Sequence, residues 1–215
     1  MKTKIYLLLF FQCFLSLALT AQYYNVQGEE ISCDCKEYTA ATPQQFTCYD
    51  KYKDKLTFTC INDKKEGEEI LYYKSGAIKS KSFYKADKKE GEVIWYYESG
   101  AIESKTFYTA GKKQGEAIWY YESGAIKTKA NYKDDKVEDE YIAYYESGGV
   151  GIKIFFKAGI LEGEEISYYE SGAIRKKSLY KAGKKEGEQI LYYESGAIYS
   201  KSLYKDDKKI GETVY

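Results

Sequence analysis

The sequence has no histidine, one proline and five cysteines among its 215 residues. Without histidine there is no Ser-His-Asp triad, no Cys-His nucleophile pair and no histidine-bound metal site. Basic and acidic residues number 33 each, so no net field attracts nucleic acid, and we expect no nucleic-acid partner. Tyrosine and glycine are abundant, with 26 and 18 copies. The 44% hydrophobic content predicts a folded chain rather than a disordered one.

Residues 1–21 are expected to form a secretory signal peptide. Lys2 and Lys4 precede an apolar run from Ile5 to Leu19, and Ala21 offers a small residue for cleavage. The run is shorter than the ~20 residues that a bilayer-spanning helix needs, which favours cleavage over an uncleaved anchor. We therefore expect an exported protein, located in the periplasm, on the outer surface or outside the cell.

The rest of the sequence is dominated by an internal repeat of 24 residues. Six full copies occupy residues 67–210 without an insertion or deletion, and a shortened copy begins at Gly211. The six copies begin at Gly67, Gly91, Gly115, Asp139, Gly163 and Gly187. A fixed period of this length indicates a repeat architecture in which each unit packs mainly on its neighbours.

Each unit is predicted to form a β-hairpin. In the first copy, residues 68–73 form one arm, residues 74–76 a three-residue loop with Gly76 in a left-handed conformation, and residues 77–85 the second arm. Residues 86–88 then turn the chain again. The predicted fold class is all-β: an elongated antiparallel meander, or solenoid, of six 24-residue hairpin repeats with a small N-terminal cap.

Three-residue loops at both turns would fix the register of the sheet. Tyr72 would face Ile78, which would face Tyr96, so that a Tyr–Ile row crosses the sheet. The second arm would then place Lys79 and Lys81 on the same face. Beside the Tyr–Ile row would run Ile70, Ser80, Ile94 and Ser104. A single β-bulge would shift this register.

The repeated motif resembles a known family. Gly-Glu-x-Ile-x-Tyr-Tyr-Glu-Ser-Gly-Ala-Ile, followed by Tyr-Lys-x-Gly/Asp-Lys-Lys-Glu-Gly, is similar to the variant MORN repeat (membrane occupation and recognition nexus) over residues 67–215. It also resembles the YwqK-family antitoxins, which are built from that variant. The resemblance implies an elongated hairpin array, roles in protein or membrane contact, and no catalytic residues. The predicted signal peptide departs from the cytosolic antitoxins.

Four cysteines remain after the leader, all of them before the array: Cys33, Cys35, Cys48 and Cys60. An even number in an exported chain suggests disulfides. A Cys33–Cys35 bond would close a short, strained loop, which leaves Cys33–Cys48 with Cys35–Cys60, or Cys33–Cys60 with Cys35–Cys48. A zinc site from the same thiolates is the less favoured alternative, because Cys-x-Cys is an unusual zinc spacing.

The cysteine segment is predicted to cap the array. Counting back 24 residues from Gly67 leads to Pro43, so residues 43–66 resemble a degenerate repeat in which Cys48 and Cys60 take the places of Tyr72 and Tyr84. Ends of repeat arrays need a device that prevents edge-to-edge pairing. We divide the chain into a leader at 1–21, a cap at 22–66 and the repeat array at 67–215.

The candidate binding surface is a set of recurring aromatic residues. Trp95 and Trp119 are the strongest candidates, since equivalent positions in other copies hold Leu, Ala or Ser. The tyrosines expected on the same face are Tyr73, Tyr97, Tyr121, Tyr145, Tyr169 and Tyr193. The alternative is that most of these tyrosines only pack the thin sheet. Recurring lysines could bind anionic lipid or polysaccharide, but interleaved glutamates favour a solvated surface.

No catalytic, cofactor-binding or metal-binding residues are predicted, because every Glu belongs to the repeat pattern. The one break, between Asp139 and Gly151, is interpreted as a decayed turn rather than a phosphate loop. We expect an exported, non-enzymatic scaffold that binds a protein or cell-envelope component. An antitoxin or immunity protein, and a lipid- or glycan-binding module, are the alternatives, and peripheral membrane contact stays open.

Overall fold

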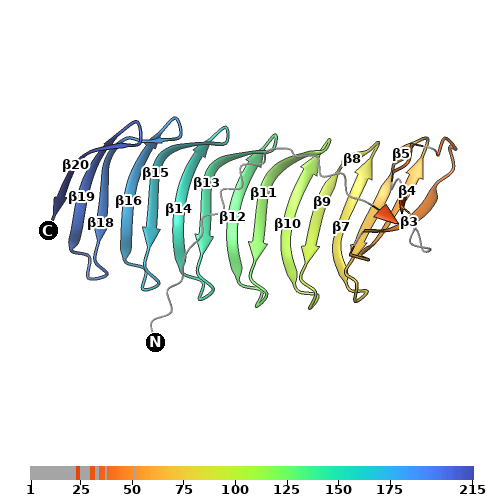
Figure 1. The fold of residues 1–215 in the computed structure, drawn as a ribbon, viewed down its shortest axis with the longest axis horizontal. Coiled ribbons are helices and arrows are strands. Elements are labelled where there is room, and N and C mark those ends of the chain that lie inside the picture. The colour runs from red at the N-terminus through yellow and green to blue at the C-terminus, as the bar shows by residue number, and fades with distance from the viewer. Residues whose placement is uncertain (1–22, 25–29, 32–33, 37, 51) are drawn as a thin grey trace.

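The computed structural model describes residues 23–24, 30–31, 34–36, 38–50 and 52–215. These residues form strands and turns within one antiparallel sheet, whose long axis runs across the strands (Figure 1). The all-β meander is therefore confirmed. In this part of the chain, no helix is long and apolar enough to cross a membrane. The predicted signal peptide lies outside the described residues.

The repeat array supplies most of the sheet, as successive antiparallel strands. Strand pairs joined by the lower turns in Figure 1 are the predicted hairpins. The strands are β6 (Gly67–Tyr72), β7 (Ile78–Lys85), β8 (Lys88–Lys89), β9 (Gly91–Tyr96), β10 (Ile102–Thr109), β11 (Lys112–Tyr120), β12 (Ile126–Lys133), β13 (Lys136–Tyr144), β14 (Val150–Lys157), β15 (Ile160–Tyr168), β16 (Ile174–Lys181), β17 (Lys184–Lys185), β18 (Gly187–Tyr192), β19 (Ile198–Lys205) and β20 (Lys208–Val214).

The segment before the array extends the same sheet. It contains β1 (Tyr23–Tyr24), β2 (Glu30–Ile31), β3 (Gln44–Asp50), β4 (Lys55–Ile61) and β5 (Lys64–Lys65). β1 pairs with both β2 and β3, β3 pairs with β4, and β4 pairs with β6. Cys60 lies opposite Lys65 just as Tyr84 lies opposite Lys89 one repeat later. The hairpin of β3 and β4 thus continues the sheet of the array by edge-to-edge strand pairing, as a further repeat would.

One disulfide closes this end of the sheet. Cys35 is bonded to Cys60, with the two Cα atoms 5.5 Å apart. Cys48 is also disulfide-bonded, and Cys33 lies outside the described residues. The pairing of Cys60 with Cys33, and of Cys35 with Cys48, is therefore wrong, and oxidised cysteines exclude the zinc alternative. The bonded cysteines are buried in a small core that includes Leu56 and Phe58.

The two turns of each repeat differ in kind. At the first, the Gly76 N–H donates to the Tyr73 carbonyl at 2.9 Å, and Gly76 has φ of 90°, so the predicted three-residue loop with a left-handed glycine is confirmed. At the second, Ala86 and Asp87 both have positive φ and join the paired residues Lys85 and Lys88. This is a two-residue turn of the primed type, so the three-residue prediction is wrong here.

A β-bulge in the second arm of each repeat changes the predicted register. Tyr72 pairs with Ile78 as expected, but Leu71 pairs with Ser80, which leaves Lys79 as the extra residue of the bulge. Ser80 then pairs with Trp95 on the next strand. The bulge moves Ser80 to the face of Leu71 and away from that of Ile70. The predicted row of Ile70, Ser80, Ile94 and Ser104 is wrong, and Ile70 instead pairs with Lys81, which pairs with Ile94.

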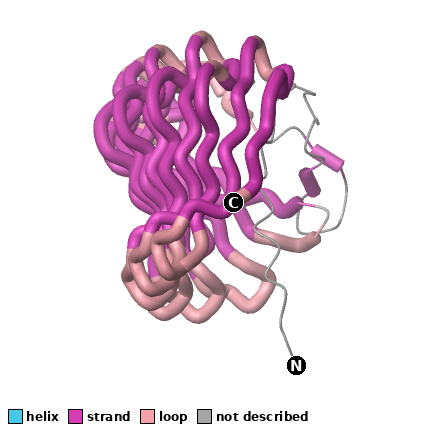
Figure 2. The backbone as a smooth tube through the Cα atoms, turned by 90° about the vertical axis from the view of Figure 1, so that its left-hand side faces the viewer, coloured by secondary structure: helices cyan, strands magenta, loops and turns pink. Residues whose placement is uncertain are grey.

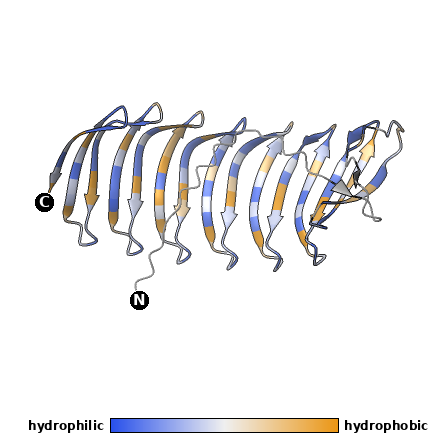
Figure 3. Ribbon diagram, in the orientation of Figure 1, coloured by the Kyte–Doolittle hydropathy of each residue, from blue (hydrophilic) through white to orange (hydrophobic). Residues whose placement is uncertain are grey.

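The core lies on one face, which we call the inner face and which carries Leu71, Ser80, Ser82 and their equivalents. The small side chains at its centre are almost fully buried, with Ser80 at 5% exposure and Ala117 at 0%. No second layer covers the sheet within the described residues. The sheet is curved (Figure 2), and the small side chains are buried because larger residues flank them in the same row, as Trp95 does Ser80. Apolar and polar segments alternate along the strands (Figure 3).

Candidate functional site

The two tryptophans stand in one row that crosses the inner face. Trp95 lies between Ser80 and Ser104, and Trp119 lies between Ser104 and Thr128. These flanking hydroxyl residues are buried, at 5–8% exposure, whereas the indole rings are only partly buried. The tryptophans therefore cover the small residues beside them, and part of each ring remains exposed to solvent.

The size of the residue at this position follows the size of its neighbours in the row. The equivalent Leu71 lies between Leu56 and Ser80, and the equivalent Leu191 lies between Lys176 and Ser200, so each leucine has one large neighbour. Where the row holds the small Ala143 and Ser167, the residue between them is Ile152, so small and large alternate to conserve volume. Trp95 and Trp119 have small residues on both sides, so part of each indole covers those residues, and the part that stays exposed is available for a partner.

A hollow of about 440 Å³ opens beside Trp119. It is lined by Tyr97, Glu103, Trp119, Lys127 and Tyr132, among others. The Trp119 and Tyr132 rings are 6.4 Å apart and tilted by 55°. The structure therefore brings Tyr97 and Trp119 to one surface, in the arrangement that the alternation of the first arm predicts. Aromatic rings with a few polar groups between them are typical of binding surfaces.

The recurring tyrosines have a second, structural role. Five of the six donate a hydrogen bond from the hydroxyl to a backbone carbonyl of the next repeat, at 2.5–2.8 Å. We call these five bonds the tyrosine ladder. They run from Tyr73, Tyr97, Tyr121, Tyr145 and Tyr169 to Tyr96, Tyr120, Tyr144, Tyr168 and Tyr192. The sequence signal was their strict recurrence, which by itself does not separate binding from packing.

Desolvation raises the pKa of several tyrosines on the inner face. Desolvation is the main reason that the pKa values of Tyr73, Tyr97 and Tyr121 lie above the usual value, and nearby glutamates add to the effect. Desolvation also raises the pKa of Tyr108 and Tyr132 on the inner face. At neutral pH the inner face therefore offers neutral phenol rings and hydroxyls.

A second set of contacts links the repeats at the opposite turns. Five glutamates each accept a backbone N–H from the turn of the following repeat, for example Glu90 from Ala110 at 2.8 Å. The other four such pairs are Glu66 with Ala86, Glu138 with Ala158, Glu162 with Ala182 and Glu186 with Asp206. These carboxylates hold turns whose first residue has positive φ.

The recurring lysines do not form one surface. Lys81 pairs with Ile70 on the outer face, whereas Lys79 in the bulge is hydrogen-bonded to Asp54 at 2.6 Å and its ammonium lies 5.3 Å from the ring centre of Tyr73. The bulge separates the two lysines that simple alternation places together. The expectation of a single lysine face is therefore wrong.

The break in the repeat between Asp139 and Gly151 forms an ordinary turn. The Gly148 N–H donates to the Tyr145 carbonyl at 2.9 Å, and the Tyr145 N–H donates to the Gly149 carbonyl at 2.8 Å, as in the other copies. The interpretation as a decayed turn is therefore supported by its geometry. Across the described ranges, no three His, Cys, Asp or Glu side chains come together in a way that could hold a metal ion.

Comparison with known proteins identifies the repeat. The model of the MORN repeat variant matches five segments that together make up about half of the chain: 65–86, 89–110, 113–134, 161–182 and 185–206. The unmatched copy is the one that contains Asp139 and Gly149. No curated protein matches the sequence, so the resemblance to the YwqK-family antitoxins stays a prediction. With five copies of its hairpin motif in an unbroken sheet, the chain belongs to the MORN repeat variant family.

Proposed function

We propose that this protein is an exported, non-enzymatic scaffold that binds a protein or cell-envelope component on the inner face of its sheet. The observation that carries the proposal is the tryptophan row. Trp95 and Trp119 are partly exposed at a position that leucine occupies in two other copies. Partly exposed tryptophan on a rigid strand contributes large contact area at a low entropic cost.

The disulfide supports the exported location. Cys35 and Cys60 are bonded and buried, and such bonds persist in oxidising compartments, whereas the cytosol reduces them. The predicted leader at residues 1–21 agrees with this location. The absence of enzymatic activity is proposed from the family, because MORN repeats are generally non-catalytic modules.

The test is capture of one partner by matched variants. Full-length mature protein would be used to isolate its partner from the native envelope fraction, and binding to the purified partner would then be measured. Trp95→Leu with Trp119→Leu gives both positions the residue found in two other copies and removes the rings, and thermal unfolding would verify that the fold is retained. We expect at least tenfold weaker binding, which corresponds to about 1.4 kcal/mol.

The control variant changes the outer face in the same way. Phe107→Leu with Phe155→Leu also introduces residues that other copies carry, as at Leu179 and Leu203, and all four side chains are exposed. This variant should bind like the unchanged protein. Equal loss in both variants, or no loss in the tryptophan variant, would contradict the inner-face proposal. Capture of a toxin as the partner would instead support the antitoxin alternative.

A further inference from the structure

The inner face departs from the repeat pattern a second time, near its C-terminal end. Lys176 stands where other copies have Ser, Thr or Ile, and Tyr199 stands where they have Lys, Glu, Gly or Arg. Both residues line one hollow of about 420 Å³. The other side chains that matter for the argument are those of Tyr169, Arg175, Leu191 and Tyr193. Departures from a repeat that converge on one hollow indicate a specialised site.

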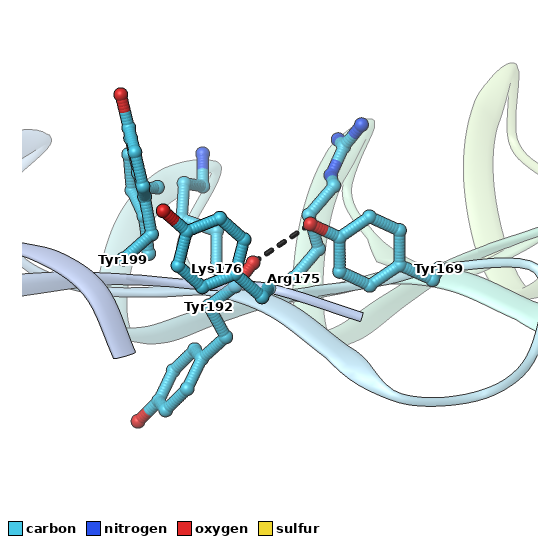
Figure 4. Close-up of a pocket in the computed structure, with 7 residues that line it drawn as sticks. Tyr169, Arg175, Lys176, Tyr192 and Tyr199 are labelled. Atoms are coloured by element: carbon cyan, nitrogen blue, oxygen red, sulfur yellow. Dashed lines mark hydrogen bonds between the residues drawn. The ribbon is translucent and has the colours of Figure 1, made fainter. Parts of the chain in front are cut away.

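The β-bulge explains why two successive cations face this hollow. Tyr168 pairs with Ile174 and Ser167 pairs with Lys176, so Arg175 is the extra residue of the bulge. Figure 4 shows Arg175, Lys176 and Tyr199 rising from the same side of the sheet, with the ring of Tyr192 directed to the other. Simple alternation would have sent Arg175 and Lys176 to opposite faces.

Only one of the two cations is neutralised by the protein. The Lys176 ammonium is paired with the Glu165 carboxylate, which is only 6% exposed. Burial, followed by the charge of Glu165, raises the pKa of Tyr180 beside this pair. Arg175 is exposed and has no carboxylate within 4 Å in the described part of the chain. It donates a 3.5 Å hydrogen bond from Nε to Ser167 Oγ.

The equivalent residue in the first repeat shows the contrast. Lys79 occupies the same bulge position and is bonded to Asp54 at 2.6 Å. Arg175 therefore differs both in its planar, multi-donor head group and in having no acidic partner from the protein. A guanidinium in this state suits a carboxylate from a ligand, which it can bind through two parallel hydrogen bonds.

Aromatic rings with available hydroxyls surround this cation. Tyr193 and Tyr199 pack edge to face with ring centres 5.2 Å apart, and they are 48% and 44% exposed. Within the described residues neither hydroxyl makes a hydrogen bond, whereas that of Tyr169 is used in the tyrosine ladder. The site thus combines flat apolar surface, two available hydroxyls and one unpaired positive charge.

We propose that this hollow binds a uronic acid residue of an acidic polysaccharide, with its carboxylate on Arg175 and its ring against Tyr193 and Tyr199. A sugar ring uses the side-chain groups that the hollow offers. An extended peptide would need free backbone groups to add as a strand, but β15, β16, β18 and β19 are all paired on both sides. The hollow contains neither Trp95 nor Trp119, so either proposal can fail alone.

The test compares an acidic oligosaccharide with its neutral ester. Binding of trigalacturonate and of its methyl ester to the full mature chain would be measured by calorimetry, with chemical shifts to locate the site. We expect the acid to bind at least tenfold more tightly than the ester, and more weakly as salt is added. Arg175→Gln should abolish that preference, since it removes the cation from an exposed position and leaves the fold intact, as thermal unfolding would verify.

The control is a lysine-to-glutamine substitution outside the binding hollows. Here the substitution removes a charge from the same strand outside the hollow, because Lys181→Gln changes an exposed lysine at the end of β16, and it should leave trigalacturonate binding unchanged. Equal affinity for acid and ester, or an undiminished preference in Arg175→Gln, would overturn the proposal. So would Arg175-dependent binding to phosphatidylserine vesicles without binding to trigalacturonate, which would identify a lipid headgroup as the ligand.

Discussion

At the scale of single residues, the tyrosine ladder joins neighbouring repeats through one atom of each side chain. Every hydroxyl in it reaches a carbonyl 23 residues ahead, across the gap between two hairpins. The 24-residue period of the sequence therefore repeats a hydrogen bond between neighbouring repeats as well as the packing of side chains. Tyr193 is the exception, because its hydroxyl has no such acceptor in the described residues.

Removing one hydroxyl from the ladder should weaken the array locally. Tyr121→Phe deletes the 2.8 Å bond to the Tyr144 carbonyl and leaves that group partly buried. We expect a loss of about 1 kcal/mol, seen as a fall of roughly 2–4 °C in the thermal midpoint. Tyr193→Phe is the matched control and should change the midpoint little. Similar effects in both variants would show that the ladder bonds contribute nothing specific.

The buried phenols also predict how stability depends on pH. Burial raises the pKa of Tyr73, Tyr97, Tyr108, Tyr121 and Tyr132 above the usual value near 10. The folded state then holds protons that the unfolded state releases. The stabilisation is complete below about pH 10 and is lost as the pH rises through the folded pKa values.

Alkaline titration followed by circular dichroism and tyrosinate absorbance would check this pH dependence. We expect the free energy of unfolding to fall above about pH 10, with the tyrosinate of these five residues forming mainly as the sheet unfolds. The lowered pKa values of Lys89 and Lys185 act in the opposite direction, but fewer groups are involved. Complete tyrosine ionisation in a sheet that stays folded would contradict the prediction.

At the scale of the hairpin, some glycines of the array are required by their backbone conformation and others are not. Gly124 has φ of 86° in the three-residue loop, where a side chain would be strained although the space is open. Gly149 has an ordinary backbone conformation and stands where the other copies carry alanine. A Cβ there would meet only ordinary contacts, at 3.7 Å from the Glu170 carbonyl oxygen.

The same substitution should therefore have opposite effects at these two glycines. Gly124→Ala should cost about 1 kcal/mol because it forces alanine into a left-handed conformation. Gly149→Ala should stabilise by about 0.4–1 kcal/mol because it restricts the unfolded chain. Urea unfolding of both variants gives the comparison. Two changes of the same sign would show that backbone conformation does not control these turns.

The sequence predicts those parts of a hairpin whose residues have a strong preference for one backbone conformation. Gly76 marks its loop because few other residues adopt positive φ. The bulge has no comparable signature, since its position is filled by Lys79, Glu103, Lys127, Gly151 and Arg175 in successive copies. A 24-residue period is compatible with any register. The pairing of faces, and with it the meeting of Arg175 and Lys176 in one hollow, required the structure.

At the scale of the whole molecule, a disulfide crosslinks the N-terminal end of the sheet, whereas the repeats of the array are held by contacts with adjacent strands. The Cys35–Cys60 bond spans 25 residues and encloses the strands β3 and β4 that precede the array. Each hairpin of the array contacts chiefly the strands on either side of it. The stability of such a sheet is approximately a sum of contributions from each repeat and from each interface between repeats. Loss of the disulfide should therefore destabilise mainly the N-terminal end.

Removing this disulfide should therefore loosen the N-terminal end selectively. Cys35→Ala with Cys60→Ala should cost about 3 kcal/mol, the value typical for a loop of this length. Hydrogen exchange is the measurement: amides of β4 and β6 should lose protection while those of β13 to β15 keep theirs. A uniform loss along the sheet would mean that the array unfolds as one cooperative unit, contrary to the prediction.

The direction of the backbone hydrogen bonds has a mechanical consequence. Because the strands lie across the long axis of the sheet, those bonds point along it, and tension applied to the two ends of the chain loads them one strand pair at a time. Hairpins are then peeled off in sequence rather than sheared together. Each one lengthens from about 10 Å of sheet to about 80 Å of extended chain. Under tension the array would therefore extend hairpin by hairpin, and the Cys35–Cys60 bond would limit extension at the N-terminal end.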